Sequence, residues 1–165
     1  MVIIVMGVSG SGKTETGQEL AKLLGGIFLD ADDFHSPENK DKMKRHISLT
    51  DEDRAPWLAR LREIIADALG KPGHTVLACS ALKLAYRYQL RVDQRNVRLV
   101  HIDGKAADIA EYMKTRNHEY FAGLDMLINQ LCTFEALRPW EEAVVVERTE
   151  DWAAMAKTAR EQLAV

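Results

Sequence analysis

A glycine-rich segment near the N-terminus constrains this chain more than any other feature. Residues 7–14 read G-V-S-G-S-G-K-T, which fits G-x-x-x-x-G-K-[ST] at every fixed position, directly after the apolar run 2–6. This pattern predicts a buried strand, a turn whose glycines let backbone N–H groups point inward, and a helix that begins near Lys13. The positive end of that helix would face the same spot. We therefore expect a phosphate-binding loop in an α/β fold.

The loop predicts binding of a nucleoside triphosphate. Lys13 is long enough to reach the β- and γ-phosphates, and the Thr14 hydroxyl suits Mg²⁺. The alternative is a glycine turn with a chance lysine, but strand, loop and amphipathic helix follow in the required order. The predicted nucleotide-binding residues are Gly7, Val8, Ser9, Gly10, Ser11, Gly12, Lys13 and Thr14.

Composition excludes several other classes of protein. The 165 residues, 47% apolar and 28% charged, fit one ordinary globular domain. A net charge of −3 argues against general affinity for nucleic acids or membranes. No apolar stretch approaches the ~18 residues of a membrane span, and we expect no signal peptide. Cys79 and Cys132 lack metal-type companions, which is typical of a reducing cytoplasm.

Short apolar runs alternate with helical patterns along the chain. Continuous runs, as expected for parallel strands covered on both faces, occupy residues 2–6, 27–30, 75–79, 97–102 and 143–147. Helices are predicted between and after them, at residues 13–24, 56–69, 83–91, 106–115 and 151–163. This order predicts a single P-loop domain, a three-layer α/β/α sandwich around a five-stranded parallel sheet.

Two longer segments interrupt the alternation. Residues 33–54 are polar and follow the second predicted strand, and residues 116–139 lie between the fourth and fifth. Insertions after parallel strands lie where ligands bind in such sheets, and long ones often close over the ligand. We interpret the first as a substrate cap and the second as a lid. The turn at 148–151 is a positional candidate for the nucleotide base.

Carboxylates follow the second predicted strand. In an extended segment Asp30 and Asp32 would point to the same face. Asp30, nearer the strand, suits Mg²⁺ through its waters, and Asp32 suits orienting or deprotonating an acceptor hydroxyl. The alternative is that Asp32 or Asp33 caps a helix through residues 35–43.

Further polar residues lie near the predicted cleft. Arg54 opposes the dipole at a helix start, so it suits a substrate carboxylate. Ser80 either caps the next helix or binds a ligand. Arg87 and Arg91 share one helix face, which is either solvated or in contact with an anion. Arg116 opens the lid and suits the charge of a transferred phosphoryl group.

The motifs together resemble those of the gluconokinases, small P-loop kinases related to shikimate kinase and the nucleoside monophosphate kinases. Residues 6–14 are similar to M-G-V-S-G-S-G-K-[ST], and residues 29–35 to L-D-[GA]-D-[DF]-[LF]-H. Two blocks are more specific: residues 49–58 match L-[TN]-D-[ED]-D-R-x-P-W-L, and residues 79–91 match C-S-A-L-K-x-x-Y-R-x-x-L-R. The lid departs from the family pattern, with its histidine one place early and residues 130–139 two longer than usual.

The resemblance implies transfer of the ATP γ-phosphate to the 6-hydroxyl of D-gluconate, with Mg²⁺ as cofactor and a homodimer as a possible assembly. It assigns the acceptor hydroxyl to Asp32, and the sugar-acid cleft to His35, Arg54 and Ser80. With the expectations above, the catalytic set is Lys13, Asp32 and Arg116; the substrate-binding set is Asp32, His35, Arg54, Ser80 and Arg87; the metal ligands are Thr14 and Asp30.

Two other functions compete with this one. A nucleoside monophosphate kinase needs several lid arginines, whereas this lid offers Arg116 and Arg138. In a nucleotide-dependent binding module, ATP would order the lid for a protein partner and Asp32 would be dispensable. A GTP switch is disfavoured because no N-K-x-D motif follows a predicted strand.

Overall fold

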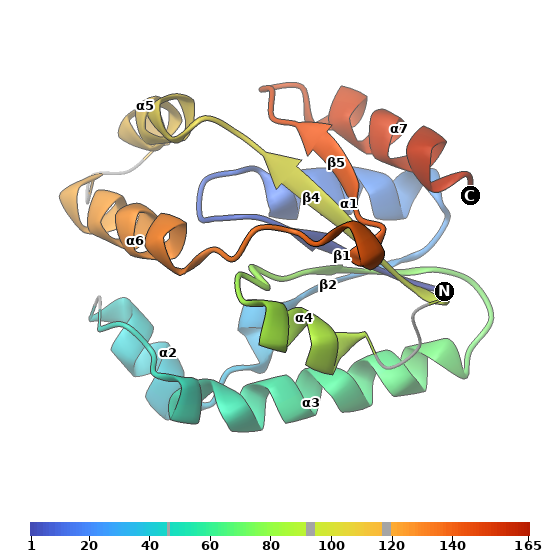
Figure 1. The fold of residues 1–165 in the computed structure, drawn as a ribbon, viewed down its shortest axis with the longest axis horizontal. Coiled ribbons are helices and arrows are strands. Elements are labelled where there is room, and N and C mark those ends of the chain that lie inside the picture. The colour runs from blue at the N-terminus through green and yellow to red at the C-terminus, as the bar shows by residue number, and fades with distance from the viewer. Residues whose placement is uncertain (46, 92–94, 117–119) are drawn as a thin grey trace.

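The described residues form one parallel sheet of five strands. The computed structural model covers residues 1–45, 47–91, 95–116 and 120–165, with only the backbone described at 116 and 120–123. The strand order is β2-β3-β1-β4-β5, and every neighbouring pair is parallel (Figure 1). The strands are β1 Val2–Met6, β2 Ile27–Asp30, β3 Thr75–Ala78, β4 Val97–Asp103 and β5 Val144–Glu147.

Helices cover both faces of the sheet, which confirms the predicted three-layer P-loop fold. Figure 1 shows α1 and α7 on one face and α3 and α4 on the other, with α2, α5 and α6 beyond the carboxyl ends of the strands. The helices are α1 Lys13–Leu23, α2 Pro37–Lys44, α3 Asp51–Leu69, α4 Leu84–Leu90, α5 Ala106–Arg116, α6 Tyr120–Thr133 and α7 Trp152–Leu163, with 3₁₀ turns η1 Ala31–Phe34 and η2 Pro139–Glu141. No described helix is long and apolar enough to cross a bilayer.

The central strand explains why the apolar runs are continuous. All five residues of β1 are buried, and alternate side chains serve opposite faces. Ile4 belongs to the core that contains Leu61 of α3. Ile3 belongs to the core that contains Leu20 of α1 and Ala156 of α7. The sheet therefore holds the loop after β1 between two packed layers.

Side-chain caps set the starts of two helices. Helix α3 extends N-terminal to the apolar pattern at 56–69 and begins at Asp51, which agrees with a helix start around Arg54; Thr50 and Asp53 form a reciprocal capping box there. Helix α2 begins at Pro37, and the Ser36 hydroxyl caps it by accepting from the Asn39 N–H at 3.2 Å. Neither Asp32 nor Asp33 therefore caps that helix.

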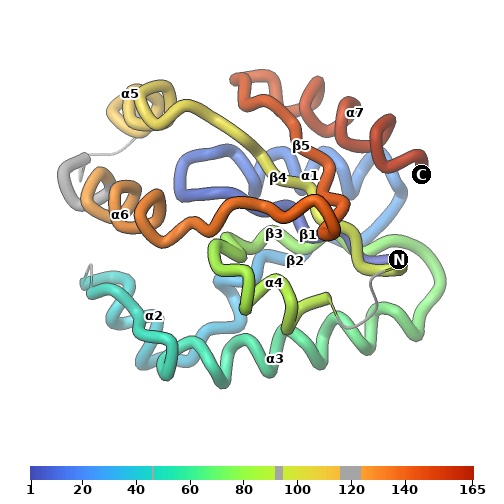
Figure 2. Tube along the Cα trace, viewed as in Figure 1, coloured from blue at the N-terminus to red at the C-terminus, as the bar shows by residue number. Residues whose placement is uncertain are grey.

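The segments interpreted as cap and lid approach one another. Figure 2 traces α2 and α6 along the same edge of the molecule. Asn129 on α6 donates an amide hydrogen bond to the Ser48 hydroxyl, in the connection between α2 and α3, at 2.9 Å. The lid segment thus contains a helix, α6, that the sequence pattern did not predict. The boundaries of cap and lid remain predictions.

Candidate active site

The phosphate loop has the backbone that its glycines allow. Gly10 and Gly12 have φ values of +76° and +87°, in the left-handed region that favours glycine. Helix α1 starts directly after Gly12, and no side chain caps it. The first-turn amides of α1 consequently face the cleft without a side-chain acceptor, which is the arrangement that binds phosphate at a helix N-terminus.

Thr14 and Asp30 form the pair of oxygen donors expected for a metal. The Thr14 hydroxyl donates to Asp30 Oδ2 at 3.2 Å, and Asp30 Oδ1 accepts from the Asp32 N–H at 3.1 Å. A hydroxyl and a carboxylate are hard oxygen ligands of the kind that Mg²⁺ takes, directly or through its waters. The two residues therefore fit the proposed metal role.

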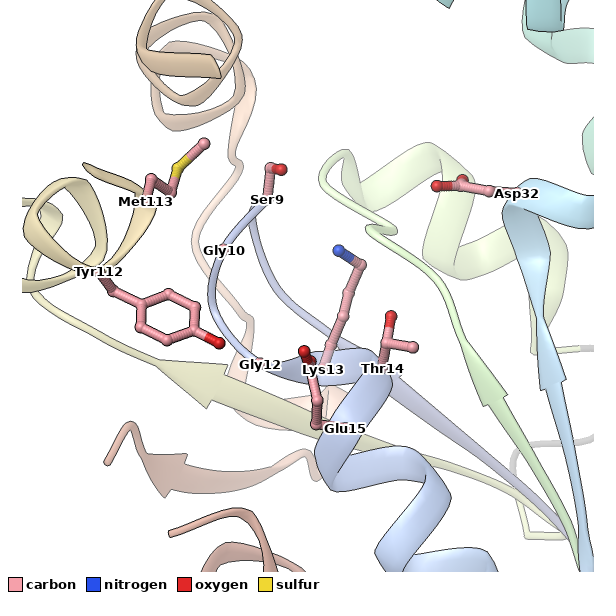
Figure 3. A pocket seen from close by; sticks show the side chains of 9 residues that line it. All are labelled: Ser9, Gly10, Gly12, Lys13, Thr14, Glu15, Asp32, Tyr112 and Met113. Carbon is pink, nitrogen blue, oxygen red and sulfur yellow. The ribbon is translucent and has the colours of Figure 1, made fainter. Parts of the chain in front are cut away.

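Asp32 and Lys13 line the same cleft of about 420 Å³, together with Ser9, Gly10, Gly12, Thr14, Glu15, Tyr112 and Met113. In Figure 3 the Lys13 side chain extends from the start of α1, and the Asp32 carboxylate projects from the segment after β2 toward the phosphate loop. Asp32 lies in the turn η1 and not in an extended strand, so its placement follows from Asp30 capping that turn, not from strand alternation.

The environment of Asp32 favours its protonated form. Enclosure by the protein raises the pKa of the carboxyl, Lys13 lowers it, and Asp30 and Asp33 raise it; the net result is a raised pKa. The side chain is still 61% exposed, because the cleft around it is open to solvent. A carboxylate with a raised pKa is a stronger base and is better suited to accept a proton.

His35 packs beneath Asp32 as a neutral ring. Its side chain is 4% exposed and stacks on Trp57 with the ring centroids 4.3 Å apart. Burial, then Arg54 and Lys40, lower its pKa to about 4. The His35 Nε2 lies 3.9 Å from Asp32 Oδ1, and Trp57 is fixed by its indole N–H bond to Ala31 O at 2.8 Å.

Arg54 lies in the first turn of α3, where its charge opposes the helix dipole. The side chain folds back so that Nη1 donates to the Leu49 carbonyl at 2.6 Å. It also lies 4.0 Å from Asp51 Oδ1, and 27% of the side chain is exposed. A guanidinium with one anchored nitrogen and an exposed portion can still offer N–H groups to an anionic ligand.

Asp51 is a site residue that sequence reasoning missed. Both of its carboxylate oxygens accept from Lys83 Nζ at 2.7 Å, and the Tyr86 hydroxyl donates to Oδ1. The hydrogen bond from Lys83 is the main cause of a lowered Asp51 pKa. The available signal in the sequence was its place in the same motif block, residues 49–58, as Arg54.

Comparison with known proteins identifies the family. Residues 2–137 match the AAA domain family described as AAA_33. The chain is 43% identical over 134 residues to a gluconokinase of Gluconobacter oxydans, covering 81% of this chain and 74% of that protein. A crystal structure of a gluconokinase from Sinorhizobium meliloti 1021 superposes with a TM-score of 0.87 at 37% identity, covering 99% of this chain and 91% of that one.

The chain belongs to the gluconokinase family of P-loop kinases. A probable gluconokinase of Xenopus tropicalis is 57% identical over 90 residues, which is 54% of this chain and only 47% of that protein. Membership makes the chain an ATP-using phosphotransferase.

Within this gluconokinase-family fold, Ser80 lies just after β3 at the carboxyl edge of the sheet and is half-buried. It does not cap α4, whose N-cap position is occupied by Lys83. The Leu84 N–H in the first turn of α4 is instead accepted by Glu135 Oε2 at 2.5 Å. Of the two alternatives for Ser80, only ligand contact remains a proposal.

Arg87 requires a correction. Its side chain is fully buried, and its Nε and Nη2 donate to the Glu141 carboxylate at 2.6 and 3.0 Å. Its Nη1 donates to Leu82 O at 3.0 Å. Arg91 is also buried and donates to Glu141 O at 2.8 Å. The helix face is neither solvated nor free for an anion, because both arginines join α4 to η2; we therefore remove Arg87 from the substrate-binding set.

The lid helix contacts the phosphate loop directly. Gln130 Oε1 accepts a hydrogen bond from the Ser9 N–H at 2.6 Å. The preceding residue, Asn129, is the one that bonds to Ser48 in the cap. Thus α6 touches both sides of the cleft. Arg116 ends α5, but its side chain lies outside the described residues, as does the lid histidine at 118, so the role expected for Arg116 remains a proposal.

Proposed function

We propose that this protein transfers the γ-phosphate of ATP to the 6-hydroxyl of D-gluconate. The observation that carries the proposal is one cleft lined by both Lys13 and Asp32, with the Asp32 carboxylate projecting toward the phosphate loop (Figure 3). Family membership supports the acceptor, because the relatives at 43% and 37% identity are named gluconokinases.

The phosphate side of the cleft holds ATP. The backbone amides in the first turn of α1 bind the β-phosphate, and the Lys13 amine stabilises the negative charge that develops on the γ-phosphate during transfer. Thr14 and Asp30 would hold Mg²⁺, directly or through its waters, and the ion would supply positive charge near the phosphates. Arg116, at the start of the lid, would add a second positive charge.

The acceptor side holds the sugar acid. Asp32 accepts the proton of the gluconate 6-hydroxyl while the hydroxyl oxygen forms a bond to the γ-phosphorus. The bond between the γ-phosphorus and the β,γ-bridging oxygen breaks, and ADP is released. His35, neutral above about pH 4, orients the hydroxyl by hydrogen bonding and not by charge. Arg54 and Ser80 bind the carboxylate and the hydroxyls at the end of gluconate that is distant from the 6-hydroxyl.

An acceptor panel tests the proposal. ADP release is measured with D-gluconate, other sugar acids, shikimate, AMP and no acceptor, each with saturating Mg-ATP. We expect gluconate to give the largest kcat/KM by at least about 10²-fold, since binding groups set for one acceptor discriminate strongly. Turnover on gluconate that does not exceed the rate without acceptor would refute the proposal, and preference for AMP would favour the nucleoside monophosphate kinase.

Two broader features belong to the same proposal. A cytoplasmic location fits a kinase that uses ATP and has two free cysteines, Cys79 and Cys132. Fractionation of the source cell would test it, with recovery outside the cytoplasm as the contrary result. A homodimer is the assembly that the family resemblance implies, and light scattering would distinguish it from a monomer of 18.6 kDa.

A further inference from the structure

A cation held between two aromatic rings lies against the phosphate loop. Arg148 follows β5, and its N–H donates to Asp103 O at 2.7 Å. Its guanidinium carbon lies 4.6 Å from the Tyr112 ring centroid and 5.7 Å from that of Trp152. The two rings meet edge to face at 71°. Three elements, α5, the β5–α7 turn and α7, therefore converge on one side chain.

This cluster touches the loop at both of its left-handed glycines. Arg148 Nε donates to the Gly10 carbonyl at 3.3 Å. A Cβ on Gly12 would lie 2.4 Å from Trp152 Cζ3, and one on Gly10 would lie 2.9 Å from Met113 Cγ. The loop is thus packed at these two glycines by side chains of α5 and α7, and Tyr112 and Met113 also line the cleft.

The bond to Gly10 fixes one peptide plane of the loop. Because a trans peptide is rigid, its C=O and N–H point in opposite directions. The carbonyl of the Gly10–Ser11 plane accepts from Arg148, and the Ser11 N–H on the opposite side of that plane donates to Val8 O at 3.2 Å. The two bonds together fix the curvature of the loop.

No ion pair accounts for the position of Arg148. Among the described residues it has no carboxylate partner within 4.0 Å, and its Nη2 is buried without a hydrogen-bond acceptor. A buried unpaired donor carries a cost of desolvation. The rings and the Gly10 carbonyl are what hold the guanidinium in place.

We propose that Arg148 is a positioning residue that, with Tyr112 and Trp152, holds the phosphate loop in its nucleotide-binding shape before ATP arrives. Pre-forming a binding loop avoids the cost of ordering it on binding, so removing the support weakens nucleotide affinity. The P-loop motif does not contain Arg148, and the proposed acceptor groups lie on the opposite side of the cleft. The inference rests on the proposed function only for its kinetic readout, since nucleotide binding is measured separately.

The test compares Arg148→Met with Arg160→Met, the same change at an exposed position of α7. Titration calorimetry with Mg-ATP and no acceptor measures affinity. We expect a dissociation constant about five- to tenfold higher in Arg148→Met, from one lost hydrogen bond and two weakened ring contacts, and no change in Arg160→Met. Arg148→Lys, which keeps the cation over Tyr112, should recover part of the loss.

Steady-state kinetics separate positioning from general damage. Arg148→Met should raise KM for ATP by a similar factor while KM for gluconate stays within twofold. Unchanged ATP affinity, or an equal rise in both KM values, would overturn the inference. If Arg148→Met fails to fold, Trp152→Phe replaces it, with the same direction expected and the same contrary results. Wild-type protein that binds ATP but phosphorylates no gluconate would refute the proposed function and leave the affinity comparison intact.

Discussion

The two sides of the cleft are built in different ways. The phosphate side is one continuous segment, residues 7–14. The conformation of its glycines orients the backbone amides and places the single lysine at the start of α1. The acceptor side is assembled from side chains of η1, α3 and the segment before α4, and Asp51 joins two of these through Lys83 and Tyr86. A backbone site is readable from one motif, whereas a side-chain site depends on contacts between segments far apart in the chain.

Two arginines show the same contrast. Arg54 and Arg87 both looked suitable for a carboxylate in the sequence. Arg54 keeps 27% of its side chain exposed and is anchored by one carbonyl, whereas Arg87 is fully buried against Glu141. One is available to a ligand, and the other holds the walls of the cleft together. Burial, not residue type, separates binding from structural roles.

The largest expected effect lies on the phosphate side. Lys13→Ala should lower turnover by on the order of 10³-fold or more, because the charge that develops on the γ-phosphate loses its nearest cation. Initial rates of ADP release measure this. Lys22→Ala, on the same helix but paired only with Glu19 at the surface, is the control and should keep full activity. A Lys13→Ala enzyme with wild-type activity would contradict the role assigned to the phosphate side of the cleft.

Arg87→Met should act on stability. Removing one partner of a buried ion pair leaves the Glu141 carboxylate uncompensated, which costs about 3–5 kcal/mol. Urea unfolding measures the loss. Burial alone would raise the pKa of Glu141, but its bonds from Arg87 and the Arg138 N–H lower it. The pair's contribution is therefore present above the unfolded pKa of a glutamate and is lost as pH falls through the folded value, so wild type and variant should converge in acid. A variant as stable as wild type would contradict this role.

Arg54→Met should act on the acceptor. One charge-assisted hydrogen bond to a carboxylate is worth enough to raise KM for gluconate by about 10- to 100-fold, with KM for ATP and the urea midpoint nearly unchanged. The matched control is Arg62→Met, an exposed arginine farther along α3. A lower urea midpoint in Arg54→Met, with KM for gluconate unchanged, would contradict the binding role and assign Arg54 a structural role like that of Arg87.

The smallest effect is on pH dependence. Because the pKa of Asp32 is raised, kcat/KM should fall on the acid side at a pH above the ordinary aspartate value of about 3.9. The sign follows from the base having to be ionised. His35, with a pKa of about 4, stays neutral between pH 5 and 8 and should add no inflection there. A pH–rate profile of His35→Asn that removes an inflection near pH 6.5 would contradict this assignment.

The fold was largely predictable because its strands are buried on both faces. The starts and ends of β1 and β2 match the predicted runs, and β3, β4 and β5 differ by one residue at one end. Continuous apolar runs mark such strands clearly. Helix α6 was missed because its segment was interpreted as an insertion.

The site was less predictable for a physical reason. The conformation of the loop at residues 7–14 is determined by the residues of the loop itself. The burial of Arg87, by contrast, depends on its ion pair with Glu141, 54 positions away. Asp51 likewise requires Lys83 across 32 positions. No local period or motif encodes such pairings, and only the folded chain distinguishes a buried arginine from an exposed one.

The central claim is that Asp32 acts on the acceptor hydroxyl and does not contribute to ATP binding. The Asp32→Asn variant tests this claim most directly. Rapid-quench measurement of phosphoryl transfer and calorimetric titration of ATP are made on the same sample, with Asp33→Asn as control. We predict a transfer rate lower by about 10²- to 10⁴-fold with ATP affinity within twofold, and a fold at least as stable, since a carboxyl with a raised pKa is replaced. Transfer at the wild-type rate in Asp32→Asn would contradict the account.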